Sequence, residues 1–276
     1  MPYPGRIVCL TEETTETLYL LGEQARIVGI SGYTVRPPEA RATKPRVGGF
    51  TSARIDRILE LKPDLVLGFS DLQADIVAEL VRRGLQVHVF NQRNVAGILA
   101  MIRLLGAMVG AAERASGLAD ELTASMAGVR ARAARRKHRP KVFFEEWDEP
   151  LISGIGWVSE LVAIAGGEDC FPELAACPLA RDRIVQPDAV VGRRPDIIIG
   201  SWCGKRFRPE KVARRPGWSE LPAVLDGEIH EIKSALILQP GPAALTDGLA
   251  ELEQIVAGWA ARPRLDRPEA ARLEDR

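Results

Sequence analysis

The sequence predicts an α/β protein of two Rossmann-like lobes with parallel sheets, joined by one long interlobe helix. A unit at residues 54–68 returns without a gap at residues 186–200, about half a chain later. A proline-free stretch at residues 111–136 falls between the two copies. One supersecondary unit that is used twice indicates two similar lobes.

Each copy of the repeated unit predicts a short amphipathic helix, a turn and a buried strand. Lys62 and Arg194 each precede a Pro-Asp pair, and apolar residues follow. Proline cannot continue a helix and disfavours the helical conformation of the residue before it, so each helix is expected to end there. The apolar residues that follow are typical of a strand buried on both faces, as in a parallel sheet.

Strand and helix patterns alternate through the first lobe, which we place at residues 1–110. The expected strands are 6–10, 26–31, 65–69 and 86–91. The expected helices are 15–21, the first repeat helix, 73–83 and 94–109. This alternation is typical of a parallel sheet covered by helices. Residues 32–49 are expected to form a long irregular loop, and loops of this length usually carry function or lie over a site.

The interlobe helix is predicted at residues 111–136, which are rich in Ala, Arg, Glu and Leu. At about 1.5 Å per residue, a helix of this length would span about 39 Å, which is more than one small lobe needs. We therefore interpret it as a rigid connection between the lobes. The alternative is two ordinary helices of the first lobe, with a break near Gly117 or Gly128.

The alternation restarts in the second lobe, which we place at residues 137–260. A strand is expected at 141–146, a helix at 157–165, the second repeat copy, a loop at 201–215, a strand at 229–232 and a last helix at 243–259. Residues 261–276 are charged, contain proline and have little apolar spacing. Such a composition cannot bury enough apolar surface to order itself, so we expect a disordered tail.

The composition excludes several classes of protein. The chain is 46% hydrophobic and 27% charged, and its formal net charge is zero, so no overall field favours nucleic acid or an anionic membrane. No apolar run approaches the roughly 18 to 20 residues of a membrane span. The first residues lack the pattern of a secretion signal. The protein is expected to be cytoplasmic if Met1 is the native start, and periplasmic or at the cell surface if a leader was removed.

The cysteines and histidines give no metal site. Cys170 and Cys177 are close enough in sequence to pair in an oxidising compartment, which the sequence leaves open. The four cysteines lack CxxC spacing, and the three histidines lie in separate segments, so no zinc or other metal-ligand cluster is predicted. The chain also carries no Gly-rich phosphate loop and no nucleophile elbow.

Candidate ligand contacts follow from the rule that open α/β sheets bind ligands beyond the carboxyl ends of their strands. The residues at these ends include Glu12, Glu13, Asp71, Glu146 and Cys203. From the full set we predict ten ligand contacts: Tyr33, Phe50, Thr51, Phe69, Ser70, Glu145, Trp147, Trp157, Ser201 and Trp202. Large aromatic side chains suit a large, flat ligand between two lobes. The alternative is that the tryptophans close a hydrophobic core.

The acidic run at residues 145–149 suggests a second hypothesis from another class, a cytoplasmic two-lobed enzyme. Glu145 or Glu146 would serve as its general acid or base. Adjacent residues of a strand point to opposite faces, so these two carboxylates cannot both face one site.

Several short segments, in a fixed order along residues 5–260, resemble those of a known family. They read RIV at 6–8, TETLYLLG at 15–22, VGIS at 28–31, VGG at 47–49 and PGW at 216–218, with further matches at 58–67 and 157–167. Together they resemble the helical-hinge (class III) substrate-binding proteins of ABC importers, and among them the vitamin B12-binding and iron-chelate-binding members.

The resemblance implies a solute-binding protein, not an enzyme, with no intrinsic cofactor. Its ligand would be a metal chelate held in the cleft, with a cobalamin-like corrinoid as the first candidate and a ferric siderophore or haem as the alternatives. Tyr33 would then be able to ligate haem iron. The family docks onto an ABC permease through one acid on each lobe, and the matching positions are Asp56 and Asp188. The family often has Glu there, and an Asp near a helix start also complements the helix dipole.

Overall fold

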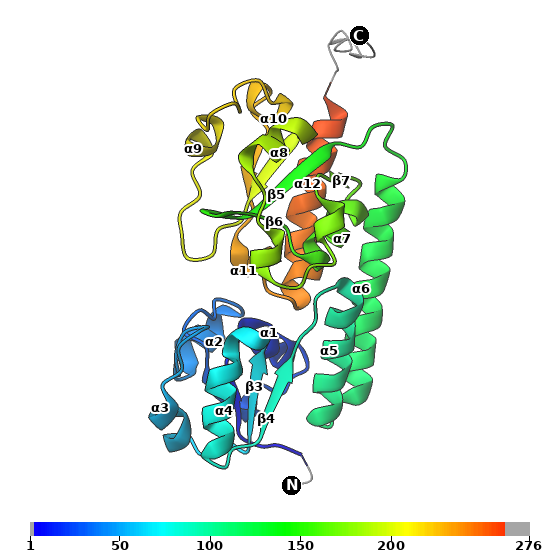
Figure 1. Ribbon diagram of the computed structural model, residues 1–276. Coiled ribbons are helices and arrows are strands. Elements are labelled where there is room, and N and C mark those ends of the chain that lie inside the picture. Colours follow the sequence, from blue (N-terminus) through cyan, green and yellow to red (C-terminus); the bar gives the residue numbers. More distant parts are fainter. Residues whose placement is uncertain (1–2, 263–276) are drawn as a thin grey trace.

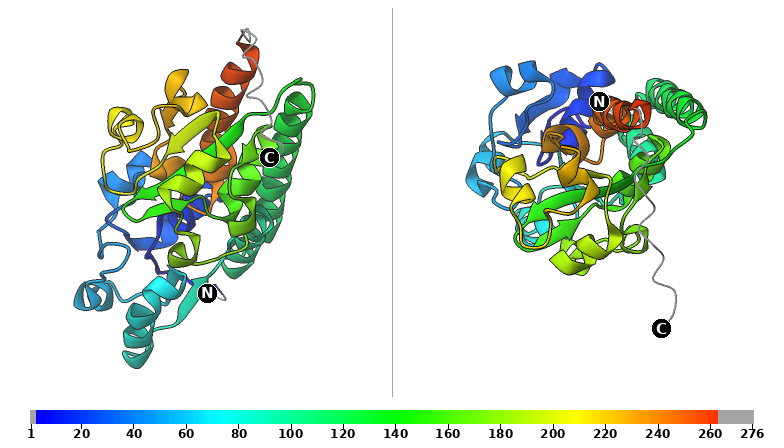
Figure 2. Two further views of the ribbon diagram at one scale, coloured as in Figure 1. Left: turned by 45° about the horizontal axis from the view of Figure 1, so that its top comes forward. Right: turned by 90° about the horizontal axis from the view of Figure 1, so that it is seen from above.

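The computed structural model describes residues 3–262 and shows two α/β lobes, each built around its own sheet (Figure 1). The first lobe lies below the second in this view, and one long helix, α6, runs along the flank of both. The two views of Figure 2 show the same arrangement from other directions. The two-lobed fold predicted from the repeat is thus confirmed.

The first lobe has a parallel sheet of four strands in the order β2-β1-β3-β4. Its elements are β1 (Ile7–Cys9), α1 (Glu12–Leu20), η1 (Gln24–Arg26), β2 (Ile27–Ile30), α2 (Pro38–Thr43), α3 (Ile55–Glu60), β3 (Leu65–Phe69), η2 (Asp71–Gln73), α4 (Ala74–Arg82), β4 (Val87–Phe90) and α5 (Val95–Met108). The chain moves outward from β1 to β2 and then resumes at β3 on the other side. The carboxyl ends of β1 and β3 therefore flank the topological switch point, where such sheets bind ligands.

The second lobe has a sheet in the order β6-β5-β8-β9, with β7 beside the start of β5. Its elements are β5 (Lys141–Asp148), β6 (Leu151–Ser153), α7 (Gly156–Ile164), β7 (Glu168–Asp169), η3 (Pro172–Leu174), η4 (Ala180–Arg183), α8 (Pro187–Arg193), β8 (Ile197–Gly200), α9 (Pro209–Ala213), α10 (Pro222–Leu225), β9 (Ile229–Glu231), α11 (Ser234–Ile237), the π-helix η5 (Ala244–Gly248) and α12 (Leu249–Ala261). This sheet is parallel except for β6, which forms an antiparallel hairpin with β5 that the sequence did not predict.

The repeated unit corresponds to α3–β3 in the first lobe and α8–β8 in the second. The basic residues that end the two helices, Lys62 and Arg194, both have left-handed φ values, 47° and 48°. The acids of the two Pro-Asp pairs accept hydrogen bonds from the neighbouring strand. Asp64 binds the amides of Gly5 and Arg6 at 2.7 and 2.9 Å, and Asp196 binds the amide of Lys141 at 2.9 Å. The repeat thus builds the same strand–strand connection in each lobe.

Helix α6 (Ala112–Ala133) is unbroken and contacts both lobes. Its buried residues recur every three or four positions, from Ala115 to Ala133, as expected of a helix with one apolar face. Near its start it packs on α5, and near its end Arg132 binds Glu253 of α12 at 2.7 Å. The interlobe helix is confirmed, and the predicted alternative, a break at Gly117 or Gly128, is not observed.

A second set of contacts, apart from α6, joins the two lobes. The amide of Ala243 donates to Glu16 at 3.1 Å, and Gln92 donates to the carbonyl of Pro240 at 2.8 Å. Arg36 of the first lobe bridges Glu16, at 3.0 Å, and Asp247 of the second lobe, at 2.7 Å. One continuous apolar core also extends through α5 and α6 into both lobes. The lobes are therefore held by more than one helix.

Some expectations concern features that the structure places elsewhere or does not describe. All four cysteines are free thiols, so Cys170 and Cys177 are not paired. No helix within residues 3–262 is both long and apolar enough to cross a bilayer. The tail predicted at residues 261–276 lies outside the described residues, except for 261 and 262 at the end of α12. The lobe boundaries, residues 1–110 and 137–260, stay predictions.

Candidate ligand-binding site

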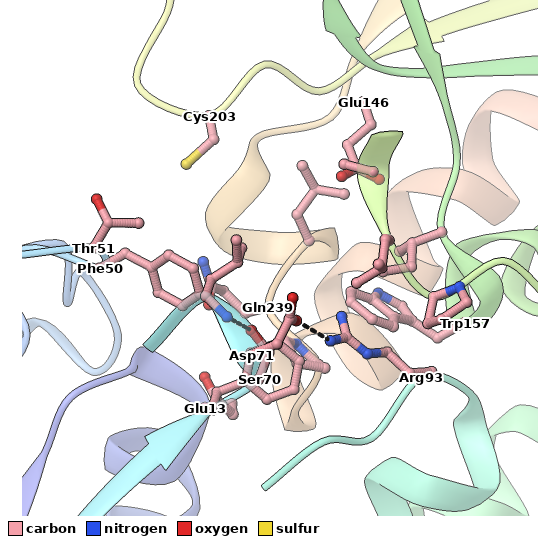
Figure 3. Close-up of a pocket in the computed structure, with 18 of the residues that line it drawn as sticks. Glu13, Phe50, Thr51, Ser70, Asp71, Arg93, Glu146, Trp157, Cys203 and Gln239 are labelled. Atoms are coloured by element: carbon pink, nitrogen blue, oxygen red, sulfur yellow. Dashed lines mark hydrogen bonds and ion pairs between the residues drawn. The ribbon is translucent and has the colours of Figure 1, made fainter. Parts of the chain in front are cut away.

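A cavity of about 550 Å³ lies between the lobes, where both contribute side chains (Figure 3). On the first lobe it begins at the ends of β1 and β3, which is the switch point of that sheet. On the second lobe it meets the end of β5, the start of α7 and the segments 178–183 and 238–240. Its volume falls within the roughly 300–1,000 Å³ that is usual for small-molecule sites.

Four aromatic side chains line the cavity, and two of them are positioned by one buried amide. Gln73 donates to the carbonyl of Phe50 at 2.8 Å and accepts from the amide of Phe69 at 2.9 Å. Trp157 reaches in from the second lobe and donates its Nε1 hydrogen to the carbonyl of Ile237 at 2.8 Å. Tyr33 lies at the rim and is 53% exposed. Apolar rings therefore face the cavity from both lobes.

Two of the three arginines that line the cavity, Arg93 and Arg183, meet acids, whereas Arg181 is largely exposed. Arg183 is almost fully buried and binds Glu146 through both terminal nitrogens, at 2.6 and 3.1 Å. Arg93 lies over the ring of Phe69, 5.0 Å from its centroid, and meets Asp71 at 3.4 Å. Figure 3 shows Arg93 and Asp71 pointing toward each other. Burial lowers the pKa of the Arg93 guanidinium, and Asp71 opposes that shift.

Two acids at the start of α1 form the floor of the cavity and lack such cations. Burial raises the pKa of Glu12 to about 7. Burial likewise raises the pKa of Glu13 to about 8, and the neighbouring Glu12 adds to that shift, whereas a hydrogen bond from Thr11 opposes it. Both carboxyls are thus more easily protonated than exposed ones, because a charge without water or a cation is costly.

The structure brings six of the ten predicted contact residues to the cavity: Tyr33, Phe50, Thr51, Phe69, Ser70 and Trp157. It does not bring Glu145, Trp147, Ser201 or Trp202 there. Whether the six contact a ligand stays a prediction.

The four predicted residues that do not line the cavity lie elsewhere in the second lobe. Glu145 is fully buried, and Arg215 binds it at 2.6 and 2.7 Å while Trp202 donates to it at 3.0 Å. Trp202 and Trp147 flank Lys205, whose ammonium lies 5.3 and 5.4 Å from their ring centroids. Ser201 is fully buried beside β5. These tryptophans therefore pack in or against a core, which was the alternative reading of the sequence.

The expected alternation of Glu145 and Glu146 is observed. Glu146 lines the cavity, whereas Glu145 points to the opposite face of β5. Glu145 is not free to act as an acid or base, because Arg215 and Trp202 occupy its oxygens.

Sequence reasoning missed several lining residues. Arg93 follows β4, so the rule about strand ends would have found it had it been applied to that strand. Arg183 and the segments 178–181 and 238–240 lie in loops and short helices, whose sequence carries no period that predicts their place. Across residues 3–262, no three His, Cys, Asp or Glu side chains are grouped so that they would hold a metal ion.

Two lobes with their own parallel sheets, a bridging helix and a cavity between them define a two-lobed solute-binding protein with a helical hinge. The chain belongs to the periplasmic binding protein family, whose model matches residues 7–236. The predicted resemblance is thereby confirmed.

Individual relatives are more distant. The chain is 24% identical to an uncharacterised ABC transporter substrate-binding lipoprotein of Bacillus subtilis, over 92% of this chain and 80% of that protein. It is 23% identical to a vitamin B12-binding protein of Vibrio parahaemolyticus, over 87% of this chain and 85% of that protein.

Two solved structures show the same fold. A periplasmic haem-binding protein, RhuT from Roseiflexus sp. RS-1, has a TM-score of 0.80 at 22% identity, over 92% of this chain and 98% of that one. The vitamin B12-binding protein BtuF of Vibrio cholerae has a TM-score of 0.74 at 21% identity, over 94% of this chain and 99% of that one.

Proposed function

We propose that the protein binds a metal chelate in the cavity between its lobes, with a corrinoid as the first candidate. The observation that carries the proposal is the cavity of about 550 Å³, into which Phe50 and Phe69 of one lobe and Trp157 of the other project. Flat rings offer a large apolar area to a flat macrocycle, and rigid side chains lose little entropy when they do so.

The vitamin B12-binding relatives support the corrinoid candidate. A corrinoid brings its own axial groups, so this cavity needs to supply only shape, apolar surface and hydrogen bonds. The exposed rim at Tyr33 and Leu72 leaves room for a ligand larger than the cavity to project into solvent.

Haem is the second candidate, because Tyr33 and Arg93 line the same cavity. A tyrosine is able to ligate haem iron, and an arginine is able to bind a propionate. A ferric siderophore remains the third. The enzyme hypothesis loses support, since Glu145 is held in an ion pair and Glu146 is bound to Arg183.

Titration of the purified protein with hydroxocobalamin, haemin and a ferric siderophore tests the proposal. We expect quenching of tryptophan fluorescence and a change in ligand absorbance at micromolar concentration for one of the three. Trp157→Phe removes the tryptophan that lines the cavity and should abolish most of the quenching, whereas the control Trp147→Phe should retain it. Absence of binding by all three chelates would contradict the proposal.

We further propose that the protein delivers its ligand to an ABC importer. The relatives include an ABC transporter substrate-binding lipoprotein. A protein that delivers a ligand to an importer must lie outside the cytoplasmic membrane. Asp56 and Asp188 are exposed on the first turns of α3 and α8, one on each lobe, as a two-point docking surface needs. Cell fractionation of the native gene product tests the location, and recovery in the cytoplasm alone would contradict it.

A further inference from the structure

The floor of the cavity carries two carboxyls that differ from every other acid of its wall. Glu146 has Arg183 as a partner and Asp71 has Arg93. Glu12 and Glu13 have no cation in contact in the described part of the chain. Arg93 and Arg183 thus each meet an acid, although the Nε of each is buried without a partner among residues 3–262, whereas the two floor acids have no cation in contact there.

One oxygen of Glu13 has no hydrogen-bond partner. Oε1 accepts a hydrogen bond from the hydroxyl of Thr11 at 2.6 Å, but Oε2 is buried and unpartnered among residues 3–262. The residue is only 1% exposed. Buried polar atoms are nearly always satisfied, and leaving one unsatisfied is costly, so this oxygen calls for a donor from outside the chain.

Glu13 lies between packed chain on one side and the cavity on the other. On one side Gly241 packs so closely that an added Cβ would lie 2.5 Å from the Glu13 Cβ, which leaves no space for another protein group. The other charged neighbours on α1 are acids, Glu12 and Glu16, and Glu16 is occupied by Arg36 and by the amide of Ala243. Glu12 and Glu13 both line the cavity.

We infer that Glu13, together with Glu12, accepts hydrogen bonds from donor groups on the ligand, so that the cavity selects a chelate bearing amides over one bearing carboxylates in the same places. This inference rests on the proposed function and narrows its substrate class. An amide N–H supplies the donor that Oε2 lacks. A carboxylate offers only acceptors, so it cannot supply that donor, and above about pH 8, where Glu13 is ionised, the floor also repels its charge.

The test compares two corrinoids that differ in these groups alone: cobyrinic acid heptaamide, whose side chains are amides, and cobyrinic acid, whose side chains are carboxylates. Dissociation constants are measured by absorbance and calorimetry for wild type, Glu13→Gln and the double variant Glu12→Gln/Glu13→Gln. The matched control is Glu121→Gln on the exposed face of α6. Circular dichroism checks that each variant is folded, and Gln keeps an oxygen that accepts the Thr11 hydroxyl.

At pH 9, above the pKa of about 8 to which burial raises Glu13, wild type should prefer the amide form by about tenfold or more, since hydrogen bonds to charged groups are among the stronger ones. The glutamine variants should lose most of this preference, because a neutral amide both donates and accepts, whereas Glu121→Gln should keep it. A wild type that binds both forms equally, or a preference unchanged in the folded double variant, would overturn the inference while leaving the proposed function intact. If neither corrinoid, nor haemin, nor a ferric siderophore binds, the proposed function itself fails.

Discussion

At the scale of single residues, burial sets the protonation of the cavity floor. Glu13 has an ordinary pKa of 4.5, which burial raises to about 8. The folded protein therefore holds a proton there that the unfolded chain has already released between these two pH values. Stability from this group is complete below pH 4.5 and is lost as the pH rises through about 8.

This difference predicts a pH dependence of stability without ligand. Wild type should lose free energy of unfolding between pH 5 and pH 9, on the scale of about 1.4 kcal/mol for each unit of pKa difference. Glu13→Gln removes the titrating group and should flatten the profile, and it should raise stability most at high pH. Thermal and urea unfolding at several pH values measure both effects. The control Glu121→Gln should follow the wild-type profile; equal slopes in all three proteins would contradict the prediction.

The same scale shows why half of the site was predictable. Strand alternation alone separates Glu145 from Glu146, because the period of a strand is two. It does not say which of the two faces the cleft. Trp202 follows β8 as the rule requires, yet its indole turns back to Glu145 and packs against Phe207, with ring centroids 4.8 Å apart. Contacts between residues far apart in sequence decide such orientations, and no local pattern records them.

At the scale of elements, one glycine of α5 and one glycine of α6 differ in how much space surrounds them. Gly106 of α5 lies so near α6 that an added Cβ would meet the Cβ of Ala115 at 2.1 Å. Gly117, on α6 itself, has no atom of residues 3–262 within 4 Å of the place where a Cβ would be. The first glycine therefore allows two helices to pack, whereas the second only weakens a helix.

Alanine at these two positions should have opposite effects on stability. Gly117→Ala should stabilise the protein by about 0.5–1 kcal/mol, since glycine in a helix interior costs that much relative to alanine. Gly106→Ala should destabilise it by about 1–3 kcal/mol, which is typical of overpacking. Urea unfolding measures both. Two changes of the same sign would show that the α5–α6 contact is not as close as described.

Long helices, the apolar strands of the parallel sheets and the repeated units were predictable, whereas the hairpin strand and the shortest helices were not. The helices α5, α6 and α12 and the strands β1 to β5 and β8 lie close to their expected ranges. The hairpin strand β6, the helices α9 to α11 and the π-helix η5 have five or fewer residues each. Such lengths cover little more than one helical turn or a few strand positions, so tertiary packing rather than periodicity defines them.

At the scale of the whole molecule, the internal repeat places equivalent acids on the two lobes. Asp56 and Asp188 each occupy the exposed first turn of the repeat helix. If both meet arginines of a permease, their joint replacement should matter far more for transport than for folding.

We therefore expect Asp56→Ala/Asp188→Ala to reduce ligand uptake at least about tenfold in cells that carry the cognate permease, since each lost ion pair with a partner weakens binding. Ligand affinity of the purified protein should be unchanged, and stability should shift by about 0.5 kcal/mol or less, as for most surface changes. The control replaces Asp75 and Asp120, which lie on the exposed surface of α4 and α6. Normal uptake by the double variant would remove the docking role.

The lobes and the general position of the cleft were predictable because they follow from the repeat and from the switch point of a parallel sheet. The part of the cavity wall that the second lobe contributes was harder to predict from the sequence. Residues 178–183 and 238–240 line the cavity, and contacts with residues far away in the sequence, such as the bond from Gln92 to the carbonyl of Pro240, help to place them.

The hydrogen bonds that join Glu16 and Gln92 of the first lobe to Ala243 and Pro240 of the second have a consequence for the rates at which a ligand binds and leaves. Because both α6 and these hydrogen bonds fix the two lobes relative to each other, the cavity has its shape before the ligand binds. Little of the chain must become ordered when the ligand binds, so we expect differences in affinity to appear mainly in the dissociation rate. Rapid release of the ligand then requires a partner, such as the proposed permease, to separate the two lobes.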